Sequence, residues 1–148
     1  MSGAEPRPLV QWREALRWLS YAAEDQRIAH FILAEEEVLG GTAFHVQQAT
    51  EKILKALLVA ASADFRRIHD LEELASLAHR HWPDVVPSPF PLARTSLWYV
   101  SSRYPGVDDV LLDAGEVAIA LDQVDALMEA VKDLVPPVLR TEGEPDTR

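Results

Sequence analysis

The chain has 148 residues and a formal net charge of −10, and it contains no cysteine. It is long enough to fold as one domain with its own core. Without cysteine it forms neither disulfides nor zinc–thiolate sites, which fits a reducing compartment. No apolar run approaches the about 20 residues of a membrane span, and no signal peptide is evident, so we expect a cytoplasmic protein with no membrane partner.

The charge is unevenly distributed along the chain. From residue 108 to the end there are eleven acidic residues and three basic ones. Residues 42–107 hold six acidic residues, seven lysines or arginines and four of the five histidines. An acidic chain argues against generic binding to a nucleic-acid backbone, which favours a basic surface. The near-neutral middle of the chain still allows a local anion site.

Apolar residues recur at helical spacing in the first part of the chain, and alternating strand patterns are absent. We expect a first helix from about Pro8 to about Val38. Gly40 and Gly41 are expected to end it, and Thr42 to cap a second helix that extends to about residue 63. The apolar positions of the two helices are Trp12, Ala15, Leu19, Ala22, Ala29 and Leu33, then Ala49, Ile53, Ala56, Leu57 and Ala60.

The second half predicts three more helices. A third begins near Asp70, a proline-rich loop follows, a fourth covers about 92–102, and the last begins near Asp113. The last helix carries apolar residues at steps of three and four, which is typical of a packing seam. These residues are Val117, Leu121, Val124, Met128, Val131 and Val135. We therefore predict an all-α, single-domain, four- to five-helix up-and-down bundle over 8–137, with a mobile tail over 138–148.

A row of polar residues lies within the second predicted helix, in FHVQQATEKILKALL. His45, Gln48, Lys52 and Lys55 are spaced three, four and three residues apart, so they share one side of a helix. Glu51 can form an ion pair with Lys55 one turn further on. The row is either a solvated surface or a polar site.

Two shorter motifs complete the polar pattern. In IHDL, Asp70 is suited to cap a helix, and His69 is either a packed histidine or a site residue. In SRYPG, Arg103 follows a predicted helix, where its charge complements the helix dipole, and Tyr104 can pack in a core. Each motif by itself has an ordinary structural interpretation.

Together, FHxQQAxEKxLKALL, HDL and RYP resemble the HEPN domain family (higher eukaryotes and prokaryotes nucleotide-binding) over roughly residues 12–135. The resemblance implies an all-helical bundle that is usually a homodimer. It also implies a domain often encoded beside a minimal nucleotidyltransferase, as one half of a toxin–antitoxin-like pair. The matching residues are Phe44, His45, Gln47, Gln48, Ala49, Glu51, Lys52, Lys55, Ala56, His69, Asp70, Leu71, Arg103, Tyr104 and Pro105.

Our first hypothesis is an accessory module that binds a nucleotide or polynucleotide phosphate and partners the nucleotidyltransferase, with no cofactor and no metal. Lysine and arginine supply positive charge, and the arginine fork suits two phosphate oxygens. The glutamine amide can bond a base or ribose group. The candidate binding residues are His45, Gln48, Lys52, Lys55, His69, Arg103 and Tyr104.

Two alternatives stay open. The first is a metal-independent ribonuclease, as the resemblance implies for the toxin branch of the family. The motif of that branch is an arginine followed by a histidine four to six residues later. The candidate catalytic residues here are His45, His69 and Arg103, since histidine moves protons and arginine stabilises phosphorane charge. No arginine in this chain precedes a histidine at that spacing, so we expect a chain that is not an enzyme. The other alternative is a bundle that only dimerises or docks a partner.

Overall fold

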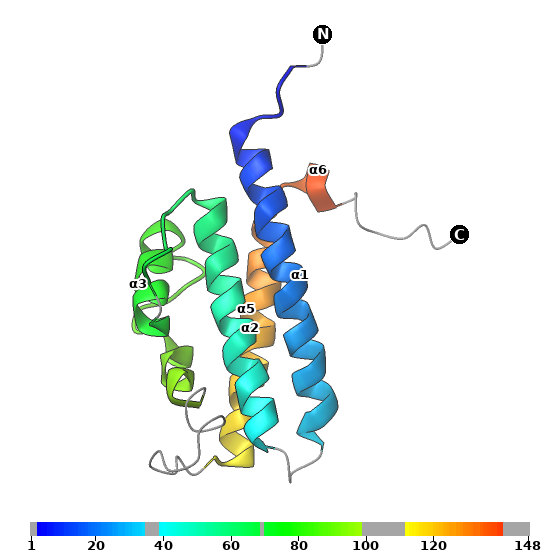
Figure 1. Ribbon diagram of the computed structural model, residues 1–148, viewed down its shortest axis with the longest axis vertical. Helices are drawn as coiled ribbons and strands as arrows, with labels where there is room; N and C mark the ends of the chain where they lie inside the picture. The colour runs from blue at the N-terminus through cyan, green and yellow to red at the C-terminus, as the bar shows by residue number, and fades with distance from the viewer. Residues whose placement is uncertain (1–2, 35–38, 69, 99–111, 141–148) are drawn as a thin grey trace, which may run out of the picture.

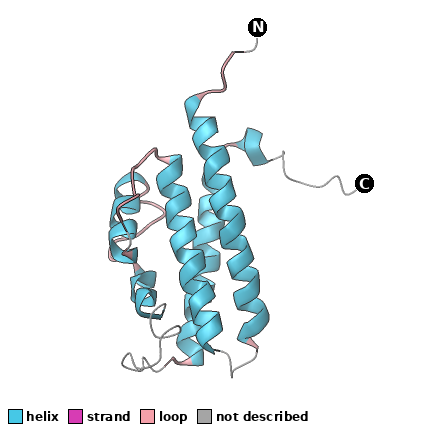
Figure 2. Ribbon diagram, in the orientation of Figure 1, coloured by secondary structure: helices cyan, strands magenta, loops and turns pink. Residues whose placement is uncertain are grey.

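The computed structural model describes residues 3–34, 39–68, 70–98 and 112–140. Every regular element in these ranges is helical, which confirms the all-α prediction (Figures 1 and 2). Helices α1 (Arg7–Leu33), α2 (Leu39–Ala60) and α5 (Ala114–Leu134) lie side by side along the long axis. Helix α3 (Leu71–His81) and the 3₁₀ helix η2 (Pro91–Thr95) complete the bundle beside α2.

Helix α1 packs one stripe against the rest of the bundle. Its buried residues recur at steps of three and four, and the expected apolar ones are joined by a carboxylate, Asp25. The helix begins directly before Pro8, whose fixed φ suits a first turn. It ends at Leu33, earlier than expected, and the last predicted residues of this helix, 35–38, lie outside the described part of the chain.

Helix α2 is the central element, and almost all of its residues are buried or half-buried. It begins at Leu39, so the expectation that Gly40 and Gly41 end α1 and that Thr42 caps α2 is wrong. All three residues lie in the first turns of α2 instead. A Cβ on Gly41 would come within 3.2 Å of the Ile32 Cδ1 atom. The glycine therefore serves the close approach of α2 to α1 rather than a helix stop.

Carboxylates cap two helices, at Asp70 as expected and also at Asp113. Asp70 accepts a hydrogen bond from the Glu72 amide (3.4 Å), and Asp113 accepts one from the Glu116 amide (3.1 Å). Each bond satisfies a backbone donor that has no partner within its own helix. All six seam residues predicted for the last helix are buried, so the seam of α5 packs inside the bundle.

The fourth predicted helix differs from expectation, and a short helix lies at the start of the predicted tail. The segment from Pro91 begins as the 3₁₀ helix η2 and is α-helical at 96–98, and the rest of that prediction lies outside the described residues. Helix α6 (Pro137–Arg140) follows α5, and its Leu139 is only 4% exposed. Leu139 thus packs on the core near the start of the predicted tail, and the mobility of 138–148 stays a prediction. Residues 141–148 are not described.

Candidate functional site

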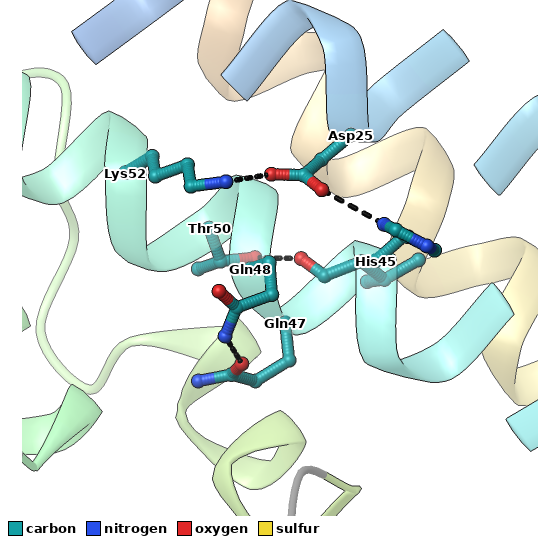
Figure 3. A network of polar contacts seen from close by, with 7 residues as sticks. Asp25, His45, Gln47, Gln48, Thr50 and Lys52 are labelled. Carbon is teal, nitrogen blue, oxygen red and sulfur yellow. Dashed lines mark hydrogen bonds and ion pairs between the residues drawn. The ribbon is translucent and has the colours of Figure 1, made fainter. Parts of the chain in front are cut away.

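The candidate site is built around a buried carboxylate between α1 and α2. Asp25 belongs to α1 and is 5% exposed. Its Oδ1 atom lies 2.8 Å from His45 Nδ1, and its Oδ2 atom accepts a hydrogen bond from the Lys52 ammonium (Figure 3). Both partners come from α2, two turns apart on one side of the helix. A buried carboxylate needs such partners because desolvation strongly penalises an unpaired charge.

The polar row is neither an open solvated face nor a set of free cations. The His45 and Lys52 side chains are 24% and 27% exposed, and the Lys55 side chain 21%. Lys55 forms the expected ion pair with Glu51 (3.1 Å), and its ammonium lies 5.5 Å from the ring centroid of Trp18 on α1. Each lysine of the row thus already has a carboxylate partner.

The two adjacent glutamines bond one another. Gln48 Nε2 donates to Gln47 Oε1 at 2.7 Å, and Figure 3 shows the two amides turned toward each other, away from Asp25. Gln47 is 7% exposed and Gln48 is half-buried. Nearby, the Thr50 hydroxyl donates to the carbonyl of Val46, one turn back along α2 (2.8 Å). Gln48 therefore keeps one amide hydrogen and its carbonyl oxygen for other groups.

The structure brings together only part of the predicted site. His45 and Lys52 meet at Asp25, while Gln48 and Lys55 stay on the same side of α2 with separate partners. His69, Arg103 and Tyr104 lie outside the described residues. The site composed of α2 and the HDL and RYP motifs therefore remains a prediction.

Asp25 is the residue that sequence reasoning missed. It follows Ala22 by three residues and precedes Ala29 by four, so it lies on the apolar stripe of α1. An acidic residue on a buried stripe is rare unless it is paired. That position, together with two basic groups on the next helix, could have indicated a buried ion pair at Asp25.

The comparison with known families bears on this arrangement. A family model described as the HEPN domain matches residues 15–134. The chain belongs to the HEPN domain family. No curated protein and no solved structure matches it. Membership supports a module related to nucleotides or RNA, and the matched range includes all of α2 and most of α1.

The geometry of this HEPN domain gives His45 a fixed orientation. Because Nδ1 faces the Asp25 carboxylate, Nε2 is the ring nitrogen left for a ligand. A carboxylate that holds an imidazole in this way fixes the orientation of its ring. The site can therefore present one oriented imidazole at a partly exposed edge of the α1–α2 interface, with Lys52 bound to the other oxygen of the same carboxylate.

A second histidine–carboxylate pair joins α1 to α5. His30 Nε2 lies 2.7 Å from Asp125 Oδ2, and Gln26 Nε2 donates to Asp125 Oδ1 at 2.8 Å. The His30 and Asp125 side chains are 51% and 36% exposed, so this pair is far better solvated than the one at Asp25. It provides a natural control for substitutions in the site.

The described residues of this HEPN domain do not meet the requirements of a metal cluster or of a membrane span. Among the described residues, no group of three or more His, Asp or Glu side chains could hold a metal ion. No described helix is long and apolar enough to cross a membrane.

A cavity of about 690 Å³ lies between α1 and the C-terminal end of α5. Beside it, Arg140 donates hydrogen bonds to the carbonyls of Val135 (2.8 Å) and Asp133 (2.6 Å).

Outside the site, one exposed ion pair allows a direct test by titration. Arg66 donates two side-chain hydrogen bonds to Asp64, at 3.1 and 2.9 Å, and its backbone amide donates another at 3.1 Å. The side-chain bonds, together with the backbone bond, lower the pKa of the Asp64 carboxyl from 3.8 to about 2. We expect the carboxyl carbon of Asp64 to titrate by NMR near pH 2, and at a higher pH in Arg66→Gln, which removes the side-chain bonds and keeps the backbone bond of residue 66. Because the folded pKa is depressed, the pair stabilises the fold above pH 4 and loses this effect as the pH falls toward 2. An unchanged midpoint in Arg66→Gln would contradict the assignment.

Proposed function

We propose that this HEPN domain is a cytoplasmic, non-enzymatic accessory module. It binds a nucleotide or a polynucleotide phosphate, forms a homodimer and partners a minimal nucleotidyltransferase in a toxin–antitoxin-like pair. The observation that carries the proposal is that His45 and Lys52, both partly exposed, bind the two oxygens of the buried Asp25. The proposed binding residues are His45, Gln48, Lys52, Lys55, His69, Arg103 and Tyr104.

The charges of the described residues define what such a site can bind. Lys52 and Lys55 are each paired with a carboxylate, so they add less attraction for phosphate than free lysines do. A ligand can still use the unbonded hydrogens of the two ammonium groups and one Gln48 amide hydrogen. It can also use His45 Nε2, which accepts a bond in the neutral imidazole and donates one in the imidazolium. In the proposal Arg103 supplies the main positive charge, because its fork can bond two phosphate oxygens. We therefore expect modest affinity, with dissociation constants in the micromolar range or weaker.

One observation favours the metal-independent ribonuclease as the second candidate. An imidazole held by a buried carboxylate is a suitable proton carrier, so Asp25 would position His45 for general acid–base chemistry. However, the sequence lacks an arginine four to six residues before a histidine. In the ribonuclease, that arginine would stabilise the negative charge of the phosphorane. For this reason we place the binding module first. The bundle that only docks a partner predicts neither binding nor cleavage.

Calorimetry of the full chain with common nucleotides and a short single-stranded RNA tests the binding proposal. We expect measurable heat at high micromolar concentration, and about a tenfold weaker affinity in His45→Ala, which is the loss of about 1.4 kcal/mol for one charge-assisted bond. His30→Ala is the matched control, since it also removes a histidine paired with an aspartate. Absence of heat from every ligand, or equal effects of the two substitutions, would refute the proposal.

RNA digestion separates the module from the nuclease. The purified chain is incubated with RNA in the presence of a metal chelator, and the proposal expects intact RNA. Cleavage that survives chelation and disappears in Arg103→Ala would replace the proposal with the ribonuclease. The neighbouring gene is an independent test, because the proposal expects a short protein there with a glycine–serine turn and paired aspartates that hold magnesium.

A further inference from the structure

Helix α1 carries a second periodic face on the side away from the core. Seven residues recur at alternating steps of four and three, and this pattern is that of the seam between two coiled helices. We call these residues the outer face. They are Val10, Glu14, Arg17, Tyr21, Glu24, Ile28 and Phe31.

The outer face gathers exposed apolar side chains. Phe31 is 83% exposed, Tyr21 57% and Val10 49%, and Ile28 between them is half-buried. The other large apolar side chains exposed in the described ranges stand singly on other segments, as Leu97, Ile119 and Val138. Single exposed apolar residues are ordinary, whereas a periodic set along one helix indicates an interaction surface.

Charges on the outer face point to the occupant. We propose that a second copy of this chain docks here, with the two α1 helices antiparallel about a two-fold axis near Tyr21. This inference rests on the homodimer of the proposed function and adds its interface. A two-fold axis pairs one surface with itself, so the face must complement its own reverse.

Four of the seven residues of the outer face meet this condition. About a point between residues 20 and 21, Val10 lies at the height of Phe31 of the second copy. Arg17 lies at the height of Glu24 of the second copy, which pairs opposite charges twice in the dimer. The two tyrosines at position 21 lie next to the axis, where they can bury their rings.

A parallel arrangement is disfavoured by the same residues. It would place each charged residue of the face opposite the same residue of the second copy. Like charges would then repel at Glu14, Arg17 and Glu24. Within one chain, Arg17 lies 3.4 Å from Glu14, and both side chains remain more than half exposed. They can therefore reach a second helix.

Sedimentation equilibrium of the full chain over a range of concentrations tests the interface. We expect a dimer whose dissociation constant rises more than tenfold in Tyr21→Glu and about tenfold in either Arg17→Glu or Glu24→Arg. The double substitution Arg17→Glu with Glu24→Arg should restore the dimer, because it re-forms opposite pairs only in the antiparallel arrangement. Ile119→Glu, on an exposed apolar residue of α5, is the control and should leave the dimer unchanged. Circular dichroism checks that each exposed variant remains folded.

The outcomes distinguish this inference from the proposed function. A chain that is monomeric at all concentrations overturns the outer-face interface and the homodimer, yet leaves nucleotide binding by calorimetry untouched. A dimer that tolerates Tyr21→Glu, or a double charge reversal that fails to restore association, overturns the interface and leaves the homodimer standing. A dimer without nucleotide binding refutes only the binding function.

Discussion

Asp25→Ala is expected to lower the free energy of unfolding by about 2–4 kcal/mol, near the range for breaking a buried ion pair. The substitution removes the common partner of His45 and Lys52 and leaves a cavity between α1 and α2. The Lys52 side chain is 27% exposed, so water partly compensates its ammonium and keeps the loss below the full cost of an isolated buried charge. Urea unfolding followed by circular dichroism measures the change.

Asp125→Ala is the matched control for this prediction. Asp125 also joins two helices through a histidine and a second polar side chain, but its own side chain is 36% exposed. An exposed pair of this kind contributes about 0–1 kcal/mol. Both variants must be compared at one protein concentration, since self-association would add to apparent stability. A loss in Asp25→Ala no larger than that in Asp125→Ala would show that Asp25 does not hold the site together.

Periodicity predicted the fold well because burial dominates the helices. The apolar stripes of α1 and α5 follow steps of three and four, and tertiary packing requires that spacing whatever the neighbours are. The ends of α1 and α2 were harder to predict. Gly40 and Gly41 are typical of helix stops, yet here Gly41 permits a close contact with Ile32, which is a tertiary requirement.

The candidate site was predictable only in part for a related reason. Helix geometry places His45 and Lys52 on one side of α2, but it cannot reveal which helix faces that side. Asp25 became a partner only when α1 packed against α2, and the contact spans 20 and 27 residues of sequence. The Glu51–Lys55 pair, in contrast, depends on a single turn of one helix and was predicted correctly.

The predicted seam of α5 raises a question that sequence periodicity alone does not answer, because such a seam suits either the core or a second copy. In the structure all six seam residues are buried within one chain, and Val124 is 0% exposed. We therefore expect Val124→Asp to abolish folding or to lower the free energy of unfolding by more than about 4 kcal/mol. The new carboxylate would be buried among apolar groups without a partner.

Ile119→Asp on the same helix introduces the same side chain and separates burial from helix propensity. Ile119 is 56% exposed, so this variant should stay within about 0.5 kcal/mol of the parent chain. Circular dichroism at 222 nm and urea unfolding of both variants provide the comparison. If Val124→Asp stayed folded and only lost its partner copy, the seam of α5 would be the interface between copies. In that case the outer face of α1 would not be the interface between copies.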